Sequence, residues 1–219
     1  SEDRIGFLTH ENGYRAIALD GVGGSTHSRH LVRELGERVL DADDFRASIE
    51  DTLRVVGEGQ VEGKVMVAAD DKLAWLQKQR LSDGAACVLA AVDYDFKNSR
   101  ATVHQIGDTV AFVQLPRRRW AVIPKALSDG KSFDSRPQQL NCKDPSGVSQ
   151  IETVQIAKAT GVIALATDGV AEHILLNGGI RKFIERVRKH DGDENALLGE
   201  LRREGIADDD LSFLLIDPQ

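Results

Sequence analysis

The sequence of 219 residues contains no apolar stretch near the ~20 residues that are needed to span a bilayer. It also has no cationic and apolar leader segment at its start. Its only two cysteines, Cys87 and Cys142, lie far apart and lack the spacing of a metal site. We therefore expect a protein with no membrane partner, located in the reducing cytoplasm, in which Cys87 is a buried thiol within an apolar run.

The chain also has no excess of basic residues. The chain has 28 Lys and Arg against 35 Asp and Glu, a net charge of -7, whereas nucleic-acid binding depends on basic surface. The one basic cluster, Arg117-Arg118-Arg119, follows Pro116 at an expected hairpin turn, where a solvated turn is the simplest interpretation. We expect no nucleic-acid partner. The acidic balance instead suits a protein that holds divalent cations.

The chain shows no internal repeat, low-complexity tract or linker, so we expect a single domain over residues 1–219. Short apolar runs predict strands, and helical periodicity fills two blocks, about 28–79 and about 170–203. The predicted strands are Ile5–Thr9, Tyr14–Leu19, Ala85–Val92, Ala101–Ile106, Thr109–Leu115, Trp120–Ile123, Glu152–Ile156, Gly161–Ala166 and Leu211–Ile216. Consecutive strands with segregated helices favour antiparallel sheets in α+β layers.

Local signals set the expected boundaries. Glu11-Asn12-Gly13 predicts a hairpin turn, because Asn-Gly readily adopts positive φ. Breaks are expected in the first helical block near Asp41–Asp44 and Gly57–Gly63. In the second block, Asp193 and Asn195 are candidate helix caps.

Aspartates stand at the ends of several predicted strands. Asp20 follows one strand, Asp168 follows another, and Asp209 directly precedes the last one. Asp108 occupies a tight turn between two further strands. If the strands carrying Asp20 and Asp168 run together and the last strand runs opposite, these acids meet at one edge.

Carboxylates gathered at such an edge repel one another, which destabilises the fold and raises their pKa values. Bound cations remove this repulsion by neutralising the charges. Hard divalent ions such as Mg²⁺ and Mn²⁺ take oxygen ligands, so the pattern is consistent with a metal site. The alternative is a set of ordinary turns, since Asp-Gly is a common turn dipeptide and the chain contains five. Spacing alone leaves both interpretations open.

Six short motifs occur in a fixed order along the chain. They are Glu2-Asp3-Arg4, Ala18-Leu19-Asp20-Gly21-Val22-Gly23-Gly24, Ser82-Asp83-Gly84-Ala85-Ala86, Ile106-Gly107-Asp108-Thr109, Ala166-Thr167-Asp168-Gly169 and Asp209-Asp210-Leu211-Ser212. This order resembles the metal-dependent protein phosphatase family, protein phosphatase 2C, in its compact bacterial form. The resemblance implies an α+β fold, an antiparallel β-sandwich flanked by helices on both faces, with a dinuclear metal site at one edge.

The resemblance also implies which residues hold the paired cations, Mn²⁺ or Mg²⁺. Asp20 matches the carboxylate that bridges both ions, and Gly21 matches the residue whose carbonyl contacts the second ion. Asp168 and Asp209 match the remaining ligands of the first ion.

Other acids match outer positions of that site. Glu2 and Asp3 match an acidic motif that acts through water, and Asp108 matches the acid that helps hold a third, weaker cation in bacterial relatives. The chain departs from the family pattern at Val22, where eukaryotic members carry a histidine. It also lacks the strand that usually precedes the acidic motif, and its flap region, about 128–150, is short.

The activity implied is the hydrolysis of phosphoserine and phosphothreonine in proteins by a metal-activated water, without a phosphoenzyme. His27 and His30 are the nearest candidates for protonating the leaving oxygen, although surface positions on a helix explain them more simply. The implied partners are a phosphorylated protein substrate and a cognate kinase system, and we expect a monomer.

Two other functions remain open. The first is a catalytically weak or inactive phosphatase-like domain that binds partners or regulates, although Asp20, Asp168 and Asp209 are all present. The second is a hydrolase of small phosphate esters. A nucleotide triphosphatase is disfavoured, because no Gly-rich sequence ending in Lys-Ser or Lys-Thr occurs.

Overall fold

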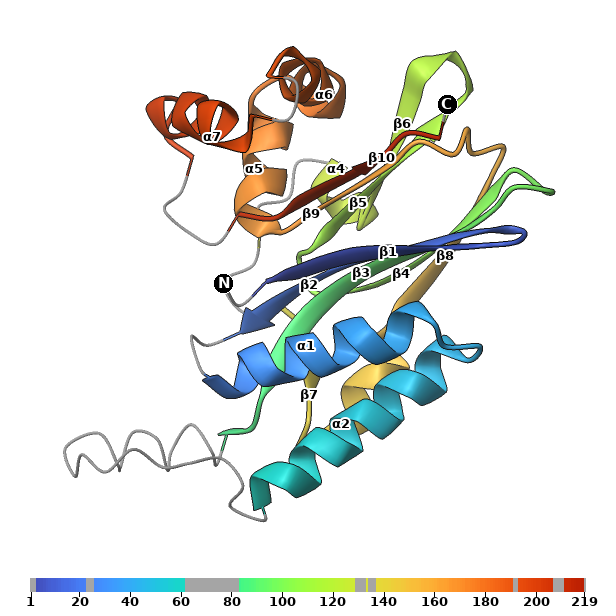
Figure 1. The fold of residues 1–219 in the computed structure, drawn as a ribbon, viewed down its shortest axis with the longest axis vertical. Helices are drawn as coiled ribbons and strands as arrows, with labels where there is room; N and C mark the ends of the chain where they lie inside the picture. The colour runs from blue at the N-terminus through green and yellow to red at the C-terminus, as the bar shows by residue number, and fades with distance from the viewer. Residues whose placement is uncertain are drawn as a thin grey trace.

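The structure is a computed structural model that describes residues 3–22, 26–61, 83–128, 133, 137–190, 193–206 and 211–218. Two antiparallel sheets form its centre (Figure 1). The first sheet has the order β1-β2-β3-β4-β8, with the short β7 paired to β3. The second has the order β10-β9-β5-β6. The strands of the first sheet are β1 (Arg4–His10), β2 (Gly13–Val22), β3 (Ala86–Asp95), β4 (Arg100–Ile106), β7 (Leu140–Asn141) and β8 (Glu152–Ala157). Those of the second are β5 (Val110–Leu115), β6 (Arg119–Ile123), β9 (Ile163–Ala166) and β10 (Phe213–Ile216).

Helices cover the outer face of each sheet, as Figure 1 shows. The first sheet carries α1 (Thr26–Leu40) and α2 (Phe45–Val61). The second carries α5 (Asp168–Leu176), α6 (Gly179–Lys189) and α7 (Glu194–Arg203). Shorter helical segments are η1 (Pro116–Arg118), α4 (Lys125–Ser128) and η2 (Pro145–Gln150). The predicted fold class, a helix-flanked antiparallel sandwich, is confirmed.

Three apolar layers hold these elements together. Strand β2 shows how alternation builds two of them, because successive side chains of a strand point to opposite faces. Ile17 and Leu19 pack under α1 and α2, while Ala16 and Ala18 face the second sheet among other small residues. The third layer lies between the second sheet and α5–α7, with Phe112 at its centre and fully buried.

Most predicted boundaries are close to those of the structure. Every predicted strand is present, with ends that differ by a few residues, and the turn at residues 11–12 joins β1 to β2. The break at Asp41–Asp44 separates α1 from α2. Cys87 and Cys142 are buried and not joined to each other by a disulfide, and burial raises the pKa of the Cys87 thiol. Among the described residues, no helix is long and apolar enough to cross a membrane.

One local prediction is wrong, and another can be made more exact. Helix α2 ends at Val61, within the expected break at Gly57–Gly63, and Gly57 itself lies inside the helix. Residues 62 and 63 lie outside the described residues. A Cβ atom at position 57 would lie 2.7 Å from the Cys142 carbonyl oxygen, so glycine there permits close packing instead of ending the helix. Asn195 lies inside α7, and the helix is capped by Asp193, whose carboxylate accepts the Ala196 amide at 3.0 Å.

Candidate metal centre

Four aspartates from both sheets meet at one end of the sandwich. Asp20 lies near the end of β2, and Asp3 immediately precedes β1. Because Arg4 pairs with Leu19 across these antiparallel strands, the register continues to bring Asp3 beside Asp20. Asp168 is the first residue of α5, directly after β9. Asp108 lies in the crossover from β4 in the first sheet to β5 in the second, and it is only 9% exposed.

The charges of these side chains act on one another. Burial, together with the carboxylates of Asp3, Asp168 and Asp108, raises the pKa of Asp20 to about 9. Of these three carboxylates, Asp3 has the largest effect on Asp20. Without a cation, the cluster of four aspartates therefore retains at least one proton at neutral pH, because several ionised carboxylates repel one another in a partly buried site. This donor set consists of carboxylate oxygens alone and fits Mg²⁺ or Mn²⁺ better than softer metals.

The described side chains do not complete a metal site by themselves. Within the part of the chain that the structure describes, no group of three or more His, Cys, Asp or Glu is spaced to hold a metal ion. Two predicted site residues, Glu2 and Asp209, lie outside the described residues, as does the neighbouring Asp210. The roles of Asp20, Gly21, Asp168, Asp209, Asp108, Asp3 and Glu2 as metal ligands therefore stay predictions.

Two hydrogen bonds between Thr167 and Ser212 position the residue that precedes Asp168. The Thr167 amide donates to the Ser212 carbonyl, and the Ser212 amide donates to the Thr167 hydroxyl, each at 3.1 Å. Thr167 is the N-cap of α5, yet its hydroxyl binds the strand and not the helix. The Gly169 amide donates to the Asp168 carboxylate at 2.6 Å, which suits an acid at a helix N-terminus. Sequence reasoning missed Thr167, although it stands within the Ala166-Thr167-Asp168-Gly169 motif.

Ser28 is a second positioning residue that the sequence did not reveal. It is fully buried in α1, and its hydroxyl donates to the Val22 carbonyl at 2.7 Å. The Ala86 amide approaches the same hydroxyl at 3.5 Å. Ser28 thus links α1 to the end of β2 that carries Asp20 and to the start of β3.

Gly107 shapes the turn that presents Asp108. Its φ of +89° lies in the left-handed region, where side chains are strained. A Cβ atom there would lie 2.2 Å from Cγ1 of Val88 and 2.9 Å from the Gln138 carbonyl oxygen. The Gln105 amide also donates to the Gly107 carbonyl. The crossover therefore needs glycine for both conformation and space.

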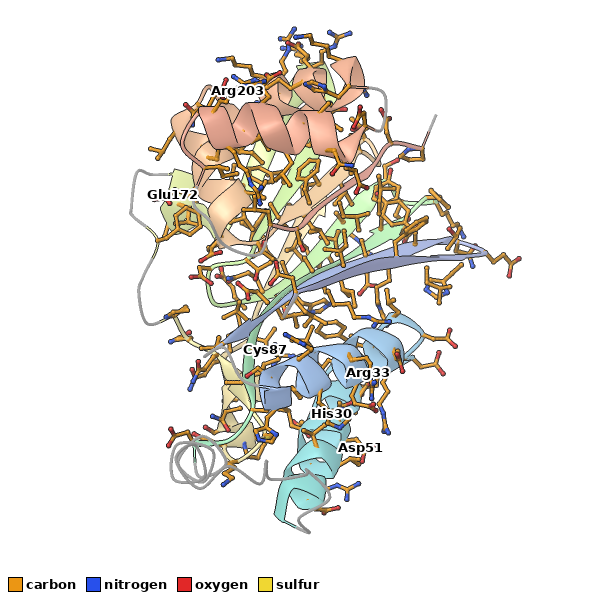
Figure 2. The ribbon with its side chains drawn as sticks, turned by 60° about the vertical axis from the view of Figure 1, so that its left-hand side comes forward. His30, Arg33, Asp51, Cys87, Glu172 and Arg203 are labelled. Atoms are coloured by element: carbon orange, nitrogen blue, oxygen red, sulfur yellow. The ribbon has the colours of Figure 1, made fainter. Side chains whose placement is uncertain are left out.

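The two candidate proton donors differ in exposure. His27 lies in the first turn of α1 and is 8% exposed, and burial and the nearby His30 lower its pKa. His30 is exposed beside Arg33 on α1, and Figure 2 shows both on that helix with Asp51 on the neighbouring α2. Neither histidine is among the groups that shift the pKa of Asp20. Their role in proton transfer stays a prediction.

A groove of about 400 Å³ adjoins Asp108. Leu127, Phe133 and Pro137 supply apolar walls, and Glu152 adds a carboxylate. The groove thus joins the carboxylate cluster to the described part of the predicted flap region, which also contains η2 and the short strand β7.

The sequence matches the model of a known family over residues 1–204, described as protein phosphatase 2C. The chain belongs to the protein phosphatase 2C family. None of the curated proteins matches the sequence closely enough to count as a relative.

Solved structures share the protein phosphatase 2C fold with this chain. Serine/threonine phosphatase Stp1 from Staphylococcus aureus is 13% identical with a TM-score of 0.56, and the match covers 100% of this chain and 90% of that one. The serine/threonine phosphatase PstP/Ppp of Mycobacterium tuberculosis is 16% identical, with a TM-score of 0.53 and coverage of 98% and 91%. RsbX, solved in complex with magnesium, is 14% identical, with a TM-score of 0.54 and coverage of 98% and 85%. At these identities the likeness establishes the fold.

Proposed function

We propose that this protein is a metal-dependent serine/threonine phosphoprotein phosphatase. The observation that carries the proposal is that Asp3, Asp108 and Asp168 gather around Asp20, whose pKa is raised to about 9 by burial and by the charges of these neighbours. Such a cluster is unfavourable for folding unless it serves to bind cations. Membership of the protein phosphatase 2C family supports the same function.

The paired cations would be held by Asp20, the Gly21 carbonyl, Asp168 and Asp209. When bound, two Mg²⁺ or Mn²⁺ ions would supply a water of lowered pKa and would neutralise charge on the phosphoryl oxygens. Asp20 lies in β2 of the first sheet, and Asp168 begins α5 just after β9 of the second sheet, so shared ligands would also join the two sheets.

The outer acids have supporting roles in this proposal. Asp3, whose charge acts strongly on Asp20, and the preceding Glu2 would act on the cations through water. Asp108 would help hold a third, weaker cation. Val22, at the end of β2, offers no proton donor, so the leaving oxygen would take its proton from His27, His30 or water.

The groove beside Asp108 supports a protein substrate. Its apolar walls at Leu127, Phe133 and Pro137 suit a side chain next to the phosphorylated residue, and Glu152 suits a basic neighbour. A phosphorylated protein, produced by a cognate kinase, therefore fits better than a small ester. We propose that the enzyme acts as a monomer in the cytoplasm.

One assay tests this function. Release of phosphate from a phosphothreonine peptide and from a small aryl phosphate is measured with Mn²⁺, with Mg²⁺ and after thorough chelation. Metal-dependent turnover of the peptide supports the proposal, and undiminished turnover after chelation contradicts it. Turnover of the ester alone would indicate a small-molecule hydrolase, and no turnover with saturating metal would indicate a regulatory domain.

A further inference from the structure

The basic cluster Arg117-Arg118-Arg119 lies at the hairpin between β5 and β6, as its position after Pro116 predicts. Its backbone conformation is unusual for arginine. Arg117 and Arg118 have φ values of 62° and 57°, and two consecutive left-handed residues other than glycine are uncommon. The strained turn places Arg118 at the wall of a pocket of about 250 Å³.

The pocket lies between this hairpin and α6. Its walls come from the second sheet, from α6 and from the segment after β10. The lining residues are Gln114, Arg118, Trp120, Val162, Arg181, Ile184, Glu185, Arg188 and Asp217. It is remote from the carboxylate cluster, because Gln114 and Val162 lie at the opposite ends of β5 and β9 from Asp108 and Asp168. Val162 and Asp168 are six positions apart, which at ~3.3 Å per strand residue corresponds to a separation of up to roughly 20 Å.

Hydrogen-bond donors outnumber acceptors in this pocket. Glu185 already accepts from Arg181 at 3.3 Å, and Asp217 accepts from Arg188. The Gln114 side-chain oxygen accepts from Thr160 at 2.9 Å. Each guanidinium has five N–H donors, so Arg181 and Arg188 retain several after these pairs form.

Arg118 increases the donor excess. Within the described part of the chain, no carboxylate is paired with it. The pocket therefore presents three guanidinium groups and the Gln114 amide to any ligand that carries acceptors. Glu185 and Asp217 reduce the positive charge without removing it, since two carboxylates face three guanidinium groups.

We propose that this pocket is a second phosphate-binding site, which holds a phosphorylated residue of a polypeptide away from the catalytic edge. Guanidinium groups bind phosphate through paired, charge-assisted hydrogen bonds, which favours a phosphate monoester over a neutral ligand. Pockets that enclose drug-sized ligands measure roughly 300–1,000 Å³. A pocket of about 250 Å³ is too small to enclose a nucleotide, yet it accommodates a phosphoserine side chain against Trp120.

The proposal predicts binding that is independent of turnover. Calorimetric titration with a phosphoserine peptide is carried out in EDTA, where the carboxylate cluster without cations repels phosphate. The full chain should bind the phosphopeptide saturably and its unphosphorylated form at least about ten-fold more weakly. Arg118→Asn, which tolerates positive φ, and Arg181→Gln should each weaken phosphopeptide binding about ten-fold.

Arg203→Ala is the matched control, because Arg203 is an exposed arginine on α7 that does not line the pocket (Figure 2). It should bind as the parent does. Absence of saturable binding, or equal binding by Arg118→Asn, Arg181→Gln and the parent, would overturn the proposal. Tighter binding of adenosine monophosphate than of the phosphopeptide would overturn the assignment to a polypeptide. Hydrolysis of a small phosphate ester should be the same in all four proteins, which separates this site from the catalytic function.

Discussion

Thr167 and Ser212 bond to each other twice, once from each backbone amide, at the ends of β9 and β10 next to Asp168. One of the two bonds needs the Thr167 hydroxyl as its acceptor. Thr167 is fully buried, so water cannot replace that acceptor. The pair ties the first residue of α5 to the chain that follows residues 207–210, where the predicted ligand Asp209 lies.

Thr167→Val should therefore weaken both the fold and cation binding. The substitution keeps the shape of the side chain and leaves the Ser212 amide without its acceptor, at a cost of about 1–3 kcal/mol in the free energy of unfolding. Mn²⁺ affinity, measured by calorimetry, should fall several-fold.

Thr160→Val is the control for that substitution. Thr160 is exposed before β9, at its other end, and its hydroxyl donates to Gln114. Its replacement should leave Mn²⁺ affinity unchanged. Equal Mn²⁺ affinities of Thr167→Val and the parent would show that the Thr167–Ser212 pair does not position the site.

The sequence predicted the layers of this fold because alternation in strands such as β2 records which face is buried. It also placed Asp20, Asp108 and Asp168 near strand ends, since an acid after an apolar run marks the end of a strand, while their roles as metal ligands stay predictions. It could not reveal Ser28 or Thr167, because their roles depend on hydrogen bonds to residues that are distant in sequence or belong to another strand.

The same limitation applies to Gly57. A glycine lowers helix propensity, yet Gly57 lies inside α2 before the helix ends at Val61. The close approach of the Cys142 carbonyl is a tertiary contact, and no local pattern records it. The basic turn at Arg117–Arg119 was located correctly, whereas the pocket beside it depends on α6, which lies far away in sequence.

The metal-free protein should lose stability as pH rises, because of Asp20. The folded-state pKa of Asp20 is about 9, against an ordinary value of 3.8, so between these values the folded protein binds more protons than the unfolded chain. Unfolding free energy therefore decreases with rising pH across that range. Asp20→Asn removes this dependence, and in EDTA at pH 8 it should melt several degrees above the parent, at roughly 3 °C per kcal/mol.

The measurement is a series of melting curves from pH 5 to pH 8 in EDTA. Comparing the parent with Asp20→Asn cancels the contribution of the histidines, which titrate in both proteins. Asp43→Asn, a change at an exposed acid in the α1–α2 turn, should follow the parent. A melting temperature of Asp20→Asn below that of the parent at pH 8 would show that Asp20 stabilises the metal-free fold.

Gly107→Ala should be among the more destabilising single substitutions in the chain. It combines a positive φ with a Cβ atom 2.2 Å from Cγ1 of Val88, so the crossover between the sheets must shift. We expect a loss of about 2–4 kcal/mol in unfolding free energy. Gly205→Ala provides the comparison, because Gly205 has φ +86° and no atom of the described residues lies within 4 Å of its Cβ position. Gly205→Ala should lose about 1 kcal/mol in unfolding free energy. Equal losses in the two variants would mean that the Val88 side chain moves aside without cost.

Substitution of Asp108 tests whether this residue is a supporting metal ligand or an ordinary turn residue. It is nearly buried and contributes to the raised pKa of Asp20, which places its carboxylate with the cluster. A site with one or two carboxylates and mostly water ligands should be weak, because Mg²⁺ dehydrates reluctantly. Asp108→Ala should therefore retain the tightly bound metal, measured by mass spectrometry, while kcat falls at least ten-fold, about 1.4 kcal/mol in the barrier.

Asp108→Asn decides between the two roles. If Asp108 only forms hydrogen bonds in the turn after Gly107, asparagine serves equally well and the rate should match the parent. If Asp108 holds a cation, asparagine lacks the charge, and the rate should stay low until Mn²⁺ is raised far above the concentration that saturates the parent. Rates are therefore measured across a Mn²⁺ titration, with circular dichroism to establish that both variants are folded. A titration of Asp108→Asn that superimposes on that of the parent would exclude a cation-binding role for this carboxylate.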